Sequence, residues 1–100
     1  MSTMEITIIE LKERLANNSV AHFIDVREEW EYDEDNLGAQ LIPLGDLPHR
    51  ITEIEHLKDT EIIIHCKSGA RAGRAQKYLI SQGFNQVKNV TGGIEAFRAF

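Results

Sequence analysis

The run Ile62-Ile63-Ile64 constrains the fold of this chain more than any other feature of its sequence. Three consecutive β-branched residues favour an extended strand, and no polar residue alternates with them. Successive side chains of a strand point to opposite faces of a sheet, so both faces must be covered here. A strand buried on both faces is typical of the centre of a parallel sheet with helices on either side.

Further short apolar runs are spaced along the chain and are also predicted as strands. Together the runs lie at residues 6–9, 22–26, 39–42, 61–65 and 86–90. Between these runs, residues recur at the spacing of a helix, in three sets: Ile8, Leu11, Leu15; Leu47, Ile51, Ile54, Leu57; and Ala72, Ala75, Tyr78, Leu79, Gln82. Gly83 is expected to end the third helix. This alternation predicts an α/β fold of three layers, α/β/α, around an open parallel sheet of about five strands.

The composition limits the class of protein. A chain of 100 residues with 42% hydrophobic and 27% charged residues is predicted to form one domain over residues 1–100. Its net charge of −5 is unsuited to nucleic acid or an anionic membrane, so neither is expected as a partner. Cys66 is the single cysteine, which excludes an internal disulfide and a multi-cysteine zinc site. Without a basic leader or an apolar stretch of about 20 residues, we expect a soluble cytoplasmic protein.

The loop directly after the central strand is the predicted site. In open α/β sheets, ligands bind outside the carboxyl ends of the strands, where loops meet helix N-termini. That loop is Cys66-Lys-Ser-Gly-Ala-Arg71, and the next helix is expected to start near Ala70 or Arg71. The thiol then lies at the positive end of a helix dipole and near two cations, which favours its thiolate form.

The small residues of this loop indicate an anion site. Residues 68–70 allow the backbone to curl, and Gly69 tolerates a positive φ, so successive N–H groups can converge. We therefore expect the Cys66 sulfur to lie open to solvent at the focus of these amides. The competing interpretation is an inert cysteine that fills space at a strand end, and the flanking cations and Gly69 argue against it.

The loop length separates two kinds of cysteine chemistry. Cysteine-based phosphatases have one residue more between nucleophile and arginine, whereas four residues separate Cys66 from Arg71 and the next position is Ala72. A smaller loop suits a persulfide carried on the cysteine, whose outer sulfur the same amides can stabilise. A phosphatase or an arsenate reductase is the less favoured alternative.

Four motifs, in order, carry a resemblance that covers nearly the whole chain. They are Phe23-Ile-Asp-Val-Arg-Glu-Glu-Trp-Glu-Tyr32, Gly38-Ala-Gln-Leu-Ile-Pro43, Cys66-Lys-Ser-Gly-Ala-Arg71 and Val90-Thr-Gly-Gly-Ile-Glu-Ala-Phe97. The chain resembles the rhodanese (thiosulfate sulfurtransferase) family in its single-domain form. It departs from the family pattern at Asp35-Asn36-Leu37, where many members have a His-Ile pair, and at Ala72, where a small hydroxyl residue is common.

The resemblance implies a rhodanese-like fold and a sulfurtransferase that works without a metal or organic cofactor. Cys66 would take sulfane sulfur from an anionic donor such as thiosulfate and pass it to a thiol or cyanide. Lys67 and Arg71, with the amides of Ser68, Gly69 and Ala70, would bind the donor. The alternative is a carrier that hands the sulfur to a protein, or a module that only docks to one.

Other polar residues are expected to play supporting or structural roles. Asp25 and Arg27 shape the floor of the pocket by resemblance, and their position at a strand end favours an ion pair. His65 precedes Cys66 in a strand, so its side chain points to the opposite face and is not expected to act as a base. The acidic run 28–35 is interpreted as a solvated helix and loop, with Trp30 packing that helix onto the sheet.

Overall fold

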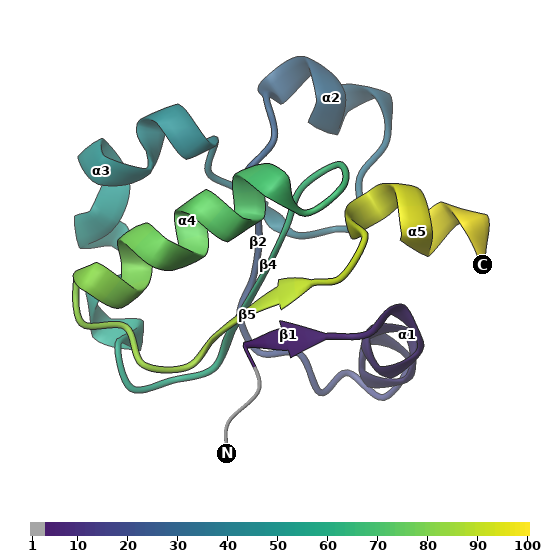
Figure 1. Cartoon of the computed structure of the whole chain (residues 1–100), viewed down its shortest axis with the longest axis horizontal. Coiled ribbons are helices and arrows are strands. Elements are labelled where there is room, and N and C mark those ends of the chain that lie inside the picture. Colours follow the sequence, from purple (N-terminus) through teal and green to yellow (C-terminus); the bar gives the residue numbers. More distant parts are fainter. Residues whose placement is uncertain (1–3) are drawn as a thin grey trace.

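A computed structural model describes residues 4–100. A five-stranded sheet has the order β1-β5-β4-β2-β3, and each pair of neighbouring strands is parallel (Figure 1). The strands are β1 (Glu5–Ile6), β2 (Phe23–Asp25), β3 (Gln40–Leu41), β4 (Ile62–His65) and β5 (Val87–Val90). Strand β4 is central, and its three isoleucines are fully buried. The prediction that residues 62–64 form a central strand covered on both faces is therefore confirmed.

Helices cover both faces of the sheet in the predicted three-layer arrangement (Figure 1). Helices α1 (Ile8–Ala16) and α5 (Gly93–Ala99) lie on one face, and α3 (Leu47–Arg50) and α4 (Ala70–Ser81) lie on the other. Helix α2 (Glu29–Glu34) stands near the carboxyl ends of β2 and β4. Within residues 4–100 no helix has the length and apolar character needed to cross a membrane.

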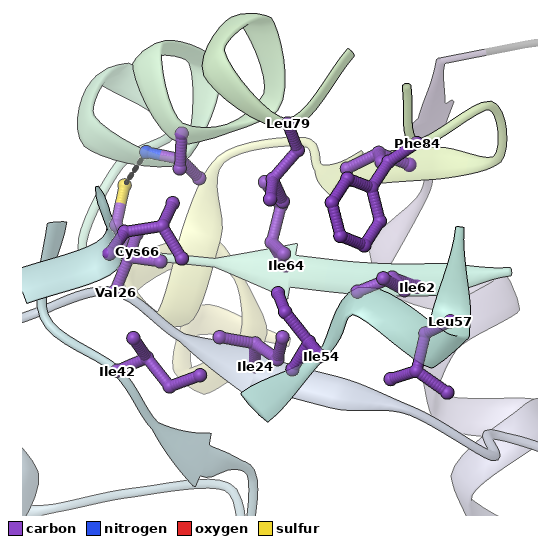
Figure 2. Packing of buried hydrophobic residues seen from close by; sticks show 14 residues of the cluster. Ile24, Val26, Ile42, Ile54, Leu57, Ile62, Ile64, Cys66, Leu79 and Phe84 are labelled. Carbon is purple, nitrogen blue, oxygen red and sulfur yellow. Dashed lines mark hydrogen bonds between the residues drawn. The ribbon is translucent and has the colours of Figure 1, made fainter. Parts of the chain in front are cut away.

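The sheet divides the core into two clusters. The larger cluster lies between the sheet and α3 and α4, and it includes Ile24, Ile64, Leu79 and Phe84 (Figure 2). The smaller one lies against α1 and α5 and is centred on Ile6, Leu11, Ile63 and Val90. Ile63 and Ile64 therefore point to opposite faces, which explains why a strand without polar alternation is needed at this position.

The segment after the prolines differs from the predicted single helix. Helix α3 ends at Arg50 and is followed by two 3-10 turns, Ile51–Glu53 and Glu55–Leu57. The apolar residues Ile51, Ile54 and Leu57 are spaced by three, which matches the repeat of a 3-10 turn better than that of an α-helix. The first apolar run is also divided, because Thr7 caps the N-terminus of α1 by accepting a hydrogen bond from the amide of Glu10.

Helix α2 packs differently from the prediction. Trp30 is 64% exposed rather than packed on the sheet. The residues that α2 directs inward are its neighbours: Glu31 is buried, and the hydroxyl of Tyr32 donates a hydrogen bond to the carbonyl of Ala39. A helix of one and a half turns at the end of a sheet presents a narrow inward face, and Trp30 lies outside it.

Candidate active site

The Cys66 sulfur lies between the end of β4 and the N-terminus of α4. It accepts hydrogen bonds from the amide of Gly69 at 3.1 Å and from the amide of Ala72 at 3.3 Å. The dashed line in Figure 2 marks the bond to Ala72. The convergence of amides on the sulfur agrees with the sequence interpretation, and such hydrogen bonds stabilise a negatively charged sulfur.

The exposure of this sulfur was predicted wrongly. Cys66 is only 1% exposed and belongs to the same buried cluster as Val26, Ile42 and Ala72 (Figure 2). The sulfur thus has an apolar side toward the core and a polar side toward the helix amides. The physical reason is the start of α4, which places Ala72 over the thiol while its N–H points at the sulfur.

The loop backbone is held in place by β5 and α5. The side-chain amide of Asn89 donates to the carbonyl of Gly69 at 3.1 Å. The amides of Ile94 and Glu95 donate to the carbonyls of Cys66 and Lys67 at 2.9 and 3.1 Å. A trans peptide directs its N–H opposite to its C=O, so the amides of Lys67 and Ser68 point away from α5. Within residues 4–100 these two amides have no hydrogen-bond acceptor.

Two glycines make this close packing feasible. Gly69 has a φ of +112°, a conformation that side chains disfavour, and it directs its amide at the sulfur. Gly93 has a φ of +62°, and a Cβ there would lie 2.4 Å from the carbonyl oxygen of Lys67 and 2.5 Å from that of Cys66. Both positions therefore require glycine for the loop to keep its shape.

Arg71 is paired with a residue that sequence reasoning missed. Its Nη1 and Nη2 donate to Oε1 and Oε2 of Glu31 at 2.5 and 2.9 Å. The Arg71 hydrogen bond lowers the pKa of Glu31 to about 2, and the carboxylate raises the pKa of Arg71. Glu31 lies in the acidic run expected to be solvated, yet it is only 8% exposed. Its spacing from Glu28 is that of a capping box, a local signal that fixes its place on α2 but not its pairing with Arg71.

The remaining loop residues form an exposed rim. Lys67 is 61% exposed at its side chain, and its Nζ lies 3.9 Å from Oε2 of Glu95. Ser68 and Ala70 are also exposed. Beside this rim a pocket of about 310 Å³ lies between α2 and α5, lined by Trp30, Lys67, Ile94 and charged neighbours. A larger, mostly apolar pocket of about 540 Å³ near Phe84 and Val87 includes none of the loop residues.

The predicted ion pair between Asp25 and Arg27 is confirmed. Arg27 donates from Nε and Nη2 to the Asp25 carboxylate at 3.1 and 2.9 Å, and the backbone amide of Arg27 adds a bond of 2.9 Å. Nη2 also donates to the carbonyl of Asp35 at 2.6 Å. Both side chains are almost fully buried. The pair therefore links the end of β2 to the segment that follows α2.

His65 lies on the far side of the strand from Cys66, as predicted. Its ring is fully buried beside Phe23, with 5.1 Å between ring centroids, and its Nε2 lies 3.5 Å from Oδ2 of Asp25. Burial is the main cause of a lowered pKa for His65, which is partly offset by the Asp25 charge. The unusual Asp35-Asn36-Leu37 segment closes its own turn, because Asn36 Oδ1 accepts from the amide of Gly38 at 2.9 Å.

Comparison with known proteins agrees with this geometry. The profile of the family described as Rhodanese-like domain matches residues 7–100. A sulfurtransferase of Allochromatium vinosum is 36% identical, and the alignment covers 93% of this chain and 86% of that protein. A Bacillus subtilis protein provisionally named a sulfur carrier is 34% identical, with coverage of 93% and 50%.

Solved structures give the same result. A rhodanese-like domain protein from Staphylococcus aureus superposes with a TM-score of 0.84 at 30% identity, and the match covers 95% of this chain and 91% of that one. On these grounds the chain belongs to the rhodanese-like domain family.

Proposed function

We propose that this protein is a sulfurtransferase that carries sulfane sulfur as a persulfide on Cys66. The observation that carries the proposal is the pair of amides, from Gly69 and Ala72, that donate to the Cys66 sulfur. These donors are fixed by the backbone, so they stabilise charge on sulfur without rearrangement during the reaction. The sulfurtransferase and the sulfur carrier among the relatives support the same chemistry.

The transfer is a double displacement. The Cys66 thiolate attacks the outer sulfur of thiosulfate, the S–S bond of the donor breaks, and sulfite leaves with the electron pair. A thiol or cyanide then attacks the outer sulfur of the persulfide and restores the thiolate. Each step exchanges one S–S or S–C bond for another with no net change in electrons, so no metal or organic cofactor is required.

The burial of Cys66 is compatible with this role. A persulfide extends the side chain by an S–S bond of about 2 Å, which moves the reactive atom beyond the buried Sγ. The amides of Lys67 and Ser68 lack acceptors within the described chain, and we propose that they receive the charge of this outer sulfur. The apolar neighbours of Sγ keep water from the thiolate and favour attack on a bound donor.

The test measures the turnover of thiosulfate and cyanide together with the intact mass of the protein. The protein is incubated with thiosulfate and cyanide, thiocyanate is followed, and Cys66→Ser is assayed in parallel. We expect turnover in the parent, a mass gain of one sulfur atom on the parent before cyanide is added, and neither in the variant. Turnover that survives the substitution would remove Cys66 from the mechanism.

A second candidate is a sulfur carrier that delivers to a protein. Its support is the relative that is provisionally named a sulfur carrier. A stable Cys66 persulfide without thiocyanate release would favour the carrier. Hydrolysis of an aryl phosphate would instead favour a phosphatase, which the short loop makes the least supported reading.

A further inference from the structure

We propose that Glu31 selects the sulfur donor, by cancelling the charge of Arg71 and so favouring a persulfide with an uncharged carbon chain over thiosulfate. This inference rests on the proposed function, because it names the donor class for the Cys66 site. It assigns to Glu31 a role in specificity and not in the chemical step.

Both cations of the active-site loop have an acidic partner from another element. Arg71 makes two hydrogen bonds to Glu31 of α2, and Lys67 lies 3.9 Å from Glu95 of α5. The active-site loop and the carboxylates paired with it therefore supply two positive and two negative side chains. A pair of unopposed cations would attract a small dianion, whereas this matched set has no net charge to attract it.

The two candidate donors place different charges in this site. Thiosulfate brings two negative charges beside a thiolate, so the complex holds three negative charges before sulfite leaves. A persulfide donates sulfur through its protonated form, R–S–SH, which is neutral at the attacked outer sulfur, so the reacting complex holds one. The thiolate forms a bond to that sulfur, the S–S bond breaks, and R–S⁻ leaves with the electron pair. The proton stays on the transferred sulfur, and atoms and charge balance.

Glu31 contributes more to this discrimination than Glu95. Its side chain is 9% exposed against 58% for Glu95, so water and salt screen its charge less. Its pKa of about 2 keeps it ionised at neutral pH. Its bonds to Arg71 also compete directly with a donor oxyanion, because they use both terminal nitrogens of the guanidinium.

The test compares two donors on three proteins. The donors are thiosulfate and 2-hydroxyethyl persulfide, whose carbon chain is uncharged. The proteins are the parent, Glu31→Gln, and the matched control Glu29→Gln, which removes an equal charge from an exposed position of the same helix. Glutamine at position 31 keeps an oxygen for the capping bond from the amide of Glu28. The loading rate of Cys66 is followed by intact mass at limiting donor, which gives a second-order rate constant.

We expect Glu31→Gln to raise the thiosulfate rate constant about tenfold, an effect of one unit charge near the donor, with a smaller gain at high salt. The persulfide rate constant should change less than about threefold, and Glu29→Gln should leave the ratio of the two unchanged. Glu95→Gln should shift the ratio in the same direction by a smaller factor. It serves as the second test if Glu31→Gln does not fold.

The outcomes separate this inference from the proposed function. If neither donor loads the parent at Cys66, the proposed function fails. If both donors load it and the thiosulfate rate constant of Glu31→Gln is unchanged or lower, Glu31 only positions Arg71 and the inference is wrong. An equal rise with both donors would also overturn it, because selection requires a change in their ratio.

Discussion

Two arginine–carboxylate pairs lie near the carboxyl end of the sheet, and they differ more in surroundings than in geometry. Asp25 and Arg27 are two residues apart in the chain, and their side chains are 0% and 6% exposed. Glu31 and Arg71 are 40 residues apart, with exposures of 9% and 29%. In each pair the carboxylate accepts hydrogen bonds from two guanidinium nitrogens.

The difference in burial assigns the two pairs different roles. Removal of one partner from the inner pair leaves a charge without access to water, which is strongly destabilising. The outer pair has an arginine that water reaches, so its partner can be removed or replaced at small cost. The inner pair is therefore a structural unit, and the outer pair is available for selection of a ligand.

The largest expected effect is on the inner pair. Asp25→Ala leaves Arg27 buried without its counter-ion, and we expect the free energy of unfolding to fall by about 3–5 kcal/mol. Urea denaturation followed by circular dichroism measures this loss. A loss below about 1 kcal/mol, the range of an exposed pair, would show that the two pairs are energetically alike.

The second effect separates stability from activity at the outer pair. Arg71→Ala should lower the free energy of unfolding by about 1–2 kcal/mol, less than Asp25→Ala, because the partially exposed Arg71 contributes less than a fully buried ion but leaves the nearly buried Glu31 without its counter-ion. It leaves the Glu31 charge unopposed at the entrance, so the thiosulfate kcat/KM should fall at least about tenfold. Urea denaturation and steady-state turnover are measured on the same preparation. Loss of the fold would make Arg71 structural and remove the contrast.

A double variant sharpens this result. Arg71→Ala with Glu31→Gln removes both charges, so the thiosulfate kcat/KM should recover part of the loss seen in Arg71→Ala. A double variant as slow as Arg71→Ala would mean that the Glu31 charge does not act on the donor. The coupling between the two sites is read from the complete mutant cycle.

The third effect is a dependence on pH of the contribution that the outer pair makes to the stability of the fold. Its partner Arg71 lowers the pKa of Glu31 from 4.5 to about 2. A carboxyl whose pKa is lower in the folded than in the unfolded protein stabilises the fold fully at pH values above its unfolded pKa. This contribution is lost as the pH falls from about 4.5 toward 2. The stability difference between the parent and Glu31→Gln should therefore shrink over this window.

The comparison with Glu31→Gln isolates that titration. Glu61, whose pKa is also lowered to about 2 by Arg14 and Lys88, titrates in both proteins and cancels in the difference. Urea denaturation at neutral pH and at several acidic values supplies the measurement. A difference that stays constant across the window would show that ionised Glu31 does not stabilise the fold.

The smallest expected effect is at Lys67. Its side chain is 61% exposed and 3.9 Å from Glu95, so Lys67→Gln should change the free energy of unfolding by less than about 0.5 kcal/mol. A modest rise in the thiosulfate KM at low salt, absent at high salt, is expected because the charge is screened. A stability loss as large as that of Asp25→Ala would contradict the ranking by burial.

Much of the fold was predictable because its signals are local. The triple isoleucine specified a strand covered on both faces, and Gly69 with its small neighbours specified a tight turn before α4. The Asp25–Arg27 pair was also predictable, since two residues of one strand end can meet without any knowledge of the tertiary fold. The single helix predicted after the prolines was wrong in detail, because an apolar spacing of three residues is compatible with an α-helix as well as with 3-10 turns.

The pairing of Arg71 was not predictable from the acidic run. Six of the eight residues from 28 to 35 are acidic, and nothing local distinguishes the one that meets the loop. The choice depends on how α2 rotates against α4, which turns Glu31 inward and leaves Trp30 exposed. The burial of the Cys66 sulfur has a similar origin, because Ala72 covers it only when α4 packs on the sheet.

By itself, the sequence determined the backbone plan of this protein: the parallel sheet, the turn after β4 and a cysteine at a helix N-terminus. The signals for these features, which are the periodicity of each segment and the residue types of the turn, are carried by residues that are neighbours in the chain. Only the tertiary structure decided which carboxylates oppose Arg71 and Lys67, and on which side the sulfur meets apolar atoms. Those contacts join α2, α4 and α5 across long stretches of chain, so they exist only after the elements have packed together.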